Sequence, residues 1–324
     1  ALDSPYPMIP VYNEEGWNVE TPPENADTSF NDPAFYVVRV TAPEALTLAA
    51  AGIEVERREN GSRQVATFAA GPARDFYLAG SEQYKMLEKT VGDTVVLSYA
   101  VESEESQARV ALNAASDALT SFNRRLTPYP YSEMELAATP MLALGIEYPG
   151  VMGITTNLYK EGGQSGGLPV EVAILSTVGH EVAHQWFYNL IGSDQVDEPW
   201  LDEAMAQYAT SLYLLDVGGE SAAQAYRSSW EARWDRVDRV AKPVGLPAGE
   251  YRGREYSAIV YGRGPIFISE LERKMGSEAF ARFLQRYSET YRWGIATTAD
   301  FKRLAEDACS CDLTPLFAEW VYAQ

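Results

Sequence analysis

The chain has 324 residues, of which 46% are hydrophobic, 12% aromatic and 22% charged, a composition that excludes intrinsic disorder and predicts a globular protein. Its 26 basic and 46 acidic side chains give a net charge of −20, which argues against nucleic acid and anionic membrane surfaces as partners. The electrostatic field of this negative charge would attract a cationic ligand such as the protonated amino terminus of a peptide. A negative net charge of this kind, however, more often serves solubility alone.

Length and the ends of the sequence suggest how the chain is organised. It exceeds the roughly 250 to 300 residues at which a single core stops growing, so we expect two domains, or one large domain with an appendage. No apolar run reaches the roughly 18 residues of a membrane helix, and residues 1–10 lack the features of a signal peptide. Because the chain opens with Ala1 rather than Met, we expect that upstream residues were removed, which favours a processed extracytoplasmic protein over a cytoplasmic one.

The cysteine content excludes a disulfide framework. Cys309 and Cys311 are one residue apart and could close at most a small ring. A structural zinc site needs four Cys or His ligands, and the only two histidines lie far away in the sequence. The cysteines therefore leave the cellular compartment open.

The first 101 residues predict β structure, part of a sandwich or an open sheet. Asn60-Gly61 lies between two β-branched segments and predicts a hairpin turn. From Ser103 onward apolar residues recur at every fourth position, which predicts a helix that the prolines at 128 and 130 end. Runs rich in β-branched and aromatic side chains predict strands at residues 35–41, 64–69 and 94–101.

The remainder of the chain predicts a mainly helical domain with a small sheet. Two short extended segments, 134–138 and 142–148, precede a Gly-rich linker at 161–168, which lacks the Lys-Ser/Thr of a phosphate-binding loop. We therefore expect an α+β protein with a partial N-terminal β domain at residues 1–101 and a second domain at residues 102–324. Capping residues, prolines and glycines predict helices at residues 170–191, 199–217, 221–238, 256–275, 277–291, 299–309 and 315–323.

The helix predicted at 170–191 is apolar almost all round, which predicts a central, buried helix in which polar residues need a reason. It contains the only histidines, His180 and His184, in the pattern HExxH. Residues four apart lie about 40° apart around a helix, so both imidazoles project from one stripe and can bind one metal ion. Glu181 lies to the side of that stripe, where its carboxylate can take a proton from a metal-bound water.

A catalytic zinc ion needs a third protein ligand and keeps its fourth position for water. With no other histidine available, this ligand must be a carboxylate or a thiolate, and Glu203 stands eighteen residues after His184, at the start of the next predicted helix. The alternative is a pair of core histidines satisfied by hydrogen bonds. Burying two imidazoles and a carboxylate together without a metal would leave unmatched polar groups, which favours the metal site.

These residues resemble a known family. HExxH at 180–184, eighteen residues and then Glu203 within WLDEAMAQY are similar to the gluzincin metallopeptidases, and more closely to the M1-type zinc aminopeptidase family. The segment LGIEY at 144–148 resembles that family's GxMEN strand, and YGRG at 261–264 resembles its Y-x-K-G segment. MIPVY at 8–12 resembles a stretch late in its N-terminal β domain.

The resemblance implies a partial N-terminal β-sandwich followed by a thermolysin-like catalytic domain, in a family whose N-terminal domain is about twice as long and where a helical domain often follows. It implies one Zn²⁺ per chain on His180, His184 and Glu203, and release of amino-terminal residues from peptide substrates. Glu181 would act as the base. Tyr261 would stabilise the transition state, and Glu147 would bind the α-ammonium of the substrate.

Several alternatives stay open. Tyr251 and Tyr256 compete with Tyr261 for the transition-state role, although the Y-x-R-G pattern favours Tyr261. Trp230 and Trp234, four apart on one helix, indicate core packing rather than a ligand cage. At 144, 146 and 148 the sequence departs from GxMEN, which favours an open-cleft endopeptidase as one alternative; a non-catalytic peptide-binding relative is another. Side-chain preference and oligomeric state do not follow from the sequence.

Overall fold

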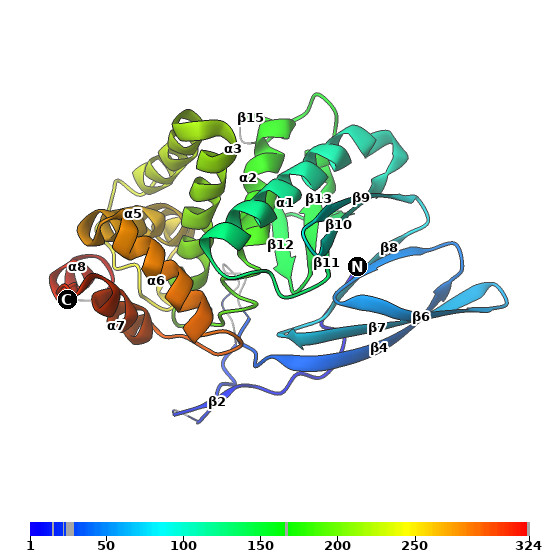
Figure 1. Cartoon of the computed structure of the whole chain (residues 1–324), viewed down its shortest axis with the longest axis horizontal. Helices are drawn as coiled ribbons and strands as arrows, with labels where there is room; N and C mark the ends of the chain where they lie inside the picture. The colour runs from blue at the N-terminus through cyan, green and yellow to red at the C-terminus, as the bar shows by residue number, and fades with distance from the viewer. Residues whose placement is uncertain (15, 22, 24–28, 166–167, 323–324) are drawn as a thin grey trace. The chain divides into compact units, whose positions relative to one another are not determined.

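The structure, a computed structural model, describes residues 1–14, 16–21, 23, 29–165 and 168–322 (Figure 1). Both helices and sheets are present, which confirms the α+β class. The domain boundary near residue 102 stays a prediction. The chain forms two compact units, the first made of Ala1–Met8, Pro33–Thr120 and Tyr129–Gln185 and the second of Ile9–Asp32, Ser121–Pro128 and Trp186–Gln324.

Two small antiparallel sheets lie in the first unit. One has the order β4-β7-β6, with β4 at Ala34–Pro43, β6 at Ile53–Asn60 and β7 at Arg63–Ala73; the other has the order β1-β8-β5, with β1 at Leu2–Asp3, β5 at Thr47–Ala50 and β8 at Tyr77–Ser81. Asn60 pairs with Arg63, and Gly61 has a φ of 67°, so the predicted hairpin is confirmed. The strands predicted at 35–41 and 64–69 correspond to β4 and β7.

A five-stranded mixed sheet forms the centre of the first unit. Its order is β12-β13-β11-β10-β9, in which β10, β11 and β13 are parallel and the two edge strands are antiparallel. Every residue of β13 is buried, as expected of a strand covered on both faces. The strands are β9 (Tyr84–Val91), β10 (Thr94–Val101), β11 (Glu133–Thr139), β12 (Gly145–Tyr148) and β13 (Val151–Thr155).

Two helices accompany this sheet (Figure 1). The first, α1 (Glu105–Arg125), starts against β10, where the Ser98 hydroxyl donates to the carbonyl of Ala108 at 3.1 Å. The second, α2 (Val170–Ala183), packs on β12 and β13. In the predicted Gly-rich linker the described residues form a short pair, β14 (Gln164–Ser165) and β15 (Leu168–Pro169); residues 166–167 lie outside the described ones.

The second unit is mainly helical. Its long helix α3 (Trp200–Asp235) is kinked at Gly219, where φ is 68°, so the two helices predicted on either side of the glycine pair are confirmed. The helix predicted at 256–275 is α4 (Glu255–Ala258), a π-helical segment (Ile259–Arg263) and α5 (Gly264–Met275). The rest are the hairpin β2 (Tyr12–Asn13) and β3 (Gly16–Trp17), and the helices α6 (Ser277–Thr290), α7 (Thr298–Cys309) and α8 (Thr314–Trp320).

The end of α2 is predicted wrongly. The sequence predicts a helix over residues 170–191, but α2 ends at Ala183. The Gln185 N–H donates to the carbonyl of Val182, three residues back, and Tyr188 has a φ of 130°, which no helix accommodates. The side chains that follow are buried in a tight turn, and an apolar run by itself does not distinguish a buried turn from a buried helix. Within α2, Val172 is exposed, so the helix is less completely buried than predicted.

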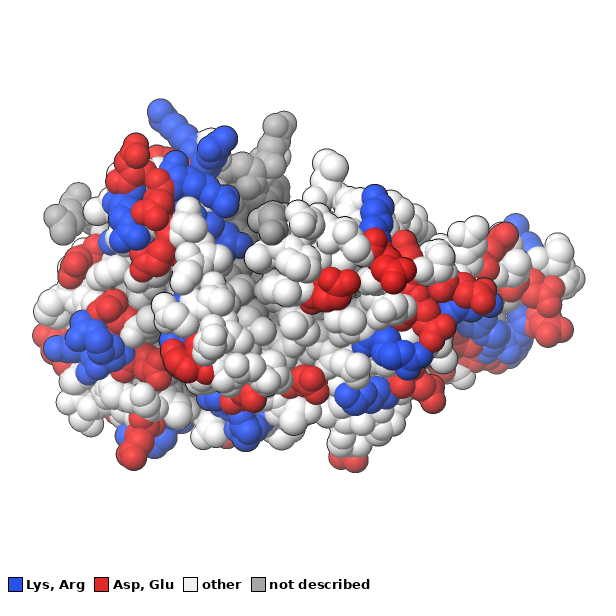
Figure 2. All heavy atoms as spheres, turned by 90° about the horizontal axis from the view of Figure 1, so that it is seen from above, with Lys and Arg blue, Asp and Glu red and all other residues white. Residues whose placement is uncertain are grey.

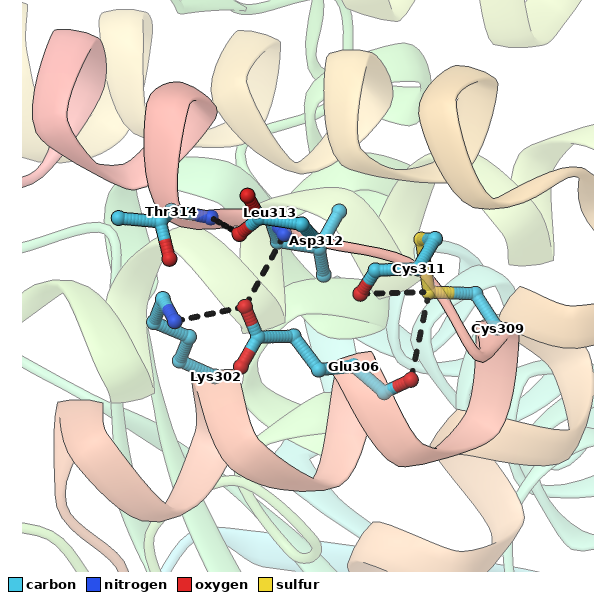
Figure 3. The surroundings of a disulfide bond; sticks show 7 residues. All are labelled: Lys302, Glu306, Cys309, Cys311, Asp312, Leu313 and Thr314. Carbon is cyan, nitrogen blue, oxygen red and sulfur yellow. Dashed lines mark hydrogen bonds and ion pairs between the residues drawn. A yellow bond between two sulfur atoms is a disulfide. The ribbon is translucent and has the colours of Figure 1, made fainter.

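A disulfide joins the two cysteines at the end of α7 (Figure 3). It closes the small ring that the sequence allows. Beside it, the Glu306 carboxylate accepts hydrogen bonds from the Lys302 ammonium at 2.6 Å and from the backbone N–H of Leu313 at 3.0 Å. The turn between α7 and α8 is therefore held by both a covalent bond and a carboxylate.

The charges are distributed widely. Acidic side chains spread over the face seen in Figure 2, with basic side chains among them. Among the described residues, no helix is both long and apolar enough to cross a membrane.

Candidate active site

The two histidines lie at the end of α2 in the first unit. His184 is fully buried and follows the last residue of the helix, and its N–H donates to the carbonyl of His180 at 3.3 Å. Although the helix ends here, the last turn keeps the helical spacing, so the two side chains stay on one stripe. Their Nε2 atoms are 3.1 Å apart, with the rings nearly perpendicular. Two imidazole nitrogens thus converge on one point.

Glu181 lies against strand β12, which carries the segment resembling GxMEN. A Cβ placed on Gly145 would lie 2.3 Å from the Glu181 Oε1 atom, so the carboxylate occupies the space that a side chain at 145 would take. Glu181 is buried, at 4% exposure. Sequence reasoning missed Gly145, although strand alternation could have found it, because Gly145 and Glu147 point to the same face.

Glu147 lies on the face of β12 that also borders the HExxH residues. Its Oε1 atom is 4.0 Å from Nδ1 of His184, and its side chain is 12% exposed. The neighbouring departures from GxMEN point elsewhere, as alternation requires. Tyr148 is buried and stacks on Tyr77 with ring centroids 4.3 Å apart, and Ile146 packs against the same apolar cluster. Leu144, in contrast, is exposed.

Gln185 is a second residue that sequence reasoning missed. It is fully buried directly after His184. Its amide donates to the carbonyl of Tyr148 at 3.0 Å, and its Oε1 atom accepts the N–H of Gly150 at 2.8 Å. Gln185 therefore ties the end of α2 to the β12–β13 hairpin, which fixes the histidines relative to Glu147. The signal that could have identified Gln185 from the sequence is its polar side chain within an otherwise apolar stretch.

Glu203 and Tyr261 meet within the second unit. Glu203 lies in the first turn of α3 and is 4% exposed. The Tyr261 hydroxyl donates a hydrogen bond to its Oε1 atom. Tyr261 belongs to the π-helical segment, a rare geometry that occurs frequently at functional sites.

The competing tyrosines have other surroundings. The Tyr251 hydroxyl donates to the carbonyl of Val244 at 2.7 Å, and burial raises the pKa of this phenol well above its usual range. Tyr256 is buried, with its ring 5.9 Å from that of Tyr261. The Tyr261 hydroxyl is thus the one that donates to Glu203, the candidate metal ligand, in agreement with the Y-x-R-G pattern.

Glycines in the YGRG segment allow it to approach α3 closely. A Cβ on Gly264 would lie 2.7 Å from the Cβ of Ala204, the residue after Glu203, and a Cβ on Gly262 would lie 2.9 Å from the carbonyl oxygen of Trp230. Real Cβ atoms avoid such distances, so a side chain at either position would push the segment away. The two glycines thereby bring Tyr261 to Glu203.

Arg263, where the family segment has Lys, is a structural residue here. It is 3% exposed, and its guanidinium donates to the carbonyls of Lys242, Glu319 and Trp320 at 2.7 to 3.2 Å. The same group lies over the ring of Trp320, and burial lowers its pKa. Arg263 therefore anchors the end of α8. Trp230 is buried, as predicted for core packing.

Comparison with known proteins identifies the family. The model of the peptidase family M1 domain matches residues 110–320, more than half of the chain. The protein therefore belongs to peptidase family M1, and the predicted family is confirmed.

Relatives in this family are aminopeptidases by name. Aminopeptidase M1-B of Oryza sativa subsp. japonica is 28% identical over 253 residues, covering 72% of this chain and 28% of its own length. Probable aminopeptidase 2 of Sulfurisphaera tokodaii is 22% identical over 280 residues, covering 82% of this chain and 35% of its own length. The chain thus spans about a third of the length of these curated relatives.

A solved structure shows the same fold. A mutant of a two-domain M1 zinc metallopeptidase bound to L-arginine superimposes with a TM-score of 0.67 at 22% sequence identity. The match covers 91% of this chain and 65% of the other.

Proposed function

We propose that the protein is a zinc-dependent aminopeptidase that releases amino-terminal residues from peptides. Membership of family M1, the names of the relatives and the placement of the HExxH side chains support this proposal. In this view residues 1–101 are part of an N-terminal β-sandwich, and residues 102–324 are a thermolysin-like catalytic domain.

The histidine geometry suits a zinc ion. Zn–N bonds of about 2.0–2.1 Å in a tetrahedral site place neighbouring ligand nitrogens about 3.4 Å apart. The two Nε2 atoms are 3.1 Å apart, close to that separation. Glu203, at the spacing of the family, completes the ligand set with a carboxylate. The donor set of two imidazoles and one carboxylate is one that catalytic zinc sites use.

Each side chain then has a distinct task. Zinc, when bound, supplies a Lewis acid that polarises the scissile carbonyl and lowers the pKa of water. Glu181 accepts a proton as the water oxygen attacks the carbonyl carbon, and delivers it to the leaving nitrogen when the C–N bond breaks. The Tyr261 hydroxyl, which donates to Glu203 in the structure, donates to the oxyanion in the transition state.

Glu147 selects a free amino terminus. Its carboxylate is held on the α2 side of β12 and is mostly buried. Burying a charged carboxylate costs free energy, and pairing with a cation lowers that cost. The α-ammonium of a peptide is such a cation. Acetylation removes that charge and leaves the carboxylate without this partner, which suppresses cleavage.

One comparison of substrates tests the proposal and its main alternative. Matched peptides with free and acetylated amino termini are incubated with the protein, with and without a chelator. We expect rapid cleavage of the free peptide alone, loss of activity with the chelator and recovery when zinc is added back. Comparable cleavage of both peptides would establish the endopeptidase alternative, which the replacements at 144, 146 and 148 favour. No cleavage of either peptide, with zinc bound, would indicate a non-catalytic peptide-binding relative.

Two variants assign the residues. His180→Ala should remove zinc, as measured by metal analysis of the purified protein.

Glu147→Ala should slow cleavage of free peptides far more than that of acetylated ones. The control is Glu88→Ala, which changes an exposed acid on β9 and should leave both rates unchanged. Equal slowing of both peptides by Glu147→Ala would remove the ammonium-binding role.

A further inference from the structure

A segment near the amino terminus reaches the loop before α3, within the second unit. We name the described residues in this stretch, 9–14, 16–21, 23 and 29–32, the strap. Its Asn18 amide donates to Oδ2 of Asp194 at 3.3 Å. Further along, both the backbone N–H and the hydroxyl of Ser29 donate to Oε1 of Gln195, at 2.5 and 3.0 Å. The strap thus contacts two consecutive residues of the loop that leads into α3.

The contacts of Ser29 determine how the Gln195 amide is turned. Because the backbone N–H of Ser29 can only donate, the end of the amide that it faces must be the carbonyl oxygen, which also accepts from the Ser29 hydroxyl. The NH₂ group then faces the other way, where it donates to Oδ2 of Asp202. The opposite orientation would set the NH₂ group against the backbone N–H of Ser29 and the carbonyl oxygen against a carboxylate. Both side chains are buried, Gln195 at 3% and Asp202 at 0% exposure.

Asp202 lies in the first turn of α3, directly before Glu203. A buried carboxylate needs a hydrogen-bond donor, and a hydrogen bond to a charged group is stronger than one between neutral groups. The Glu203 N–H donates to the carbonyl of Pro199 at 3.1 Å, so the two residues share one turn of backbone. A change in the Asp202 contact therefore moves the backbone from which Glu203 projects.

We infer that Gln195 is a positioning residue for the first turn of α3, which carries the proposed zinc ligand Glu203. Ser29 of the strap holds the Gln195 amide in one orientation. The inference rests on the proposed function, because it takes Glu203 as a zinc ligand. Neither Gln195 nor Ser29 belongs to a motif that carries the family resemblance. The strap and the first turn of α3, far apart in the sequence, act together through one amide.

The test measures zinc affinity by competition with a chelator, on the whole chain. Gln195→Glu places a carboxylate against Asp202. We expect zinc affinity to fall about 10- to 100-fold, the usual loss when a residue that orients a metal ligand is changed, with kcat falling and KM little changed. Asn18→Ala is the matched control, because it removes the other strap contact and leaves Gln195 untouched; it should bind zinc within twofold of the wild type.

A second variant distinguishes positioning from general support of the fold. Gln195→Glu combined with Asp202→Asn restores a hydrogen bond with donor and acceptor exchanged, and should recover most of the zinc affinity. Ser29→Ala removes one of the two donors and should lower zinc affinity about fivefold, the effect of one hydrogen bond. This variant keeps the inference testable if Gln195→Glu fails to fold. The thermal midpoint of the metal-free protein serves as the measure of a purely structural effect.

The outcomes separate the inference from the function on which it rests. Wild-type protein without zinc or peptidase activity would overturn the proposed function. Wild-type protein with both, together with a folded Gln195→Glu variant whose zinc affinity is within twofold, would overturn the positioning role alone. Ser29→Ala indistinguishable from Asn18→Ala would also overturn it.

Discussion

The two units hold their chemistry in different ways. In the first unit, the histidines, Glu181 and Glu147 stand on a helix end and on a strand, where their directions follow the helical and strand periods. In the second unit, Tyr261 stands on a π-helical segment, and its meeting with Glu203 depends on two glycines that let that segment approach α3. Regular structure can be predicted from spacing, whereas irregular structure depends on packing.

Removing the proposed base, Glu181, should have the largest effect. Glu181→Gln keeps the shape of the side chain and the neighbouring ligands but loses the proton acceptor. We expect kcat to fall by about 10² to 10⁴ while zinc content is unchanged. Steady-state kinetics with parallel metal analysis checks this. Turnover near that of the wild type would show that Glu181, on the regular helix α2, is not the base.

Removing the hydroxyl of Tyr261 should come next. Tyr261→Phe should lower kcat by about 10² to 10³, the usual result of losing one oxyanion donor, with little change in KM. Tyr251→Phe serves as the control, because its hydroxyl bonds a loop carbonyl rather than Glu203. A change confined to KM, or an equal effect of both variants, would assign Tyr261 to packing.

A matched pair of glycine variants tests whether the close approach of the π-helical segment to α3 is required. Gly264→Ala introduces a methyl 2.7 Å from the Cβ of Ala204, and overpacking of this kind costs about 1–3 kcal/mol of stability. It should also reduce kcat by moving Tyr261. Gly249→Ala, where a Cβ meets nothing within 4 Å, should change the free energy of unfolding far less. Urea denaturation of both variants measures the difference, and equal losses would show that close approach is not required.

The smallest effect concerns pH. Burial raises the pKa of Asp194 to about 6 from an ordinary 3.8, although the backbone N–H of Asp197 acts in the opposite direction. Between these values the native state binds more protons than the unfolded chain, so the free energy of unfolding falls as pH rises. The contribution is complete below about pH 4 and lost above about pH 6. Asp194→Asn should flatten this slope in urea titrations at several pH values; an unchanged slope would contradict the assignment.

The sequence predicted most of the helices and the main strands because their signals are local. Gly218 and Gly219 divide the α3 region, and Gly276 ends α5, since glycine has the conformational freedom these ends require. The end of α2 was not predictable in this way. After His184 the apolar residues continue without a break, and whether they form a helix or a buried turn depends on what packs around them.

For the candidate site, the sequence by itself determined which side chains could carry the chemistry: two histidines one helical turn apart, a glutamate between them and another eighteen residues on. These follow from chemical type and helical period alone. Only the tertiary structure decided how they are held, with Gln185 clamping the end of α2, Gly264 admitting the π-helical segment and Gln195 joining the strap to α3. These supporting contacts join residues distant in the sequence, and a hydrogen bond or a close approach between such residues leaves no periodic pattern along the chain.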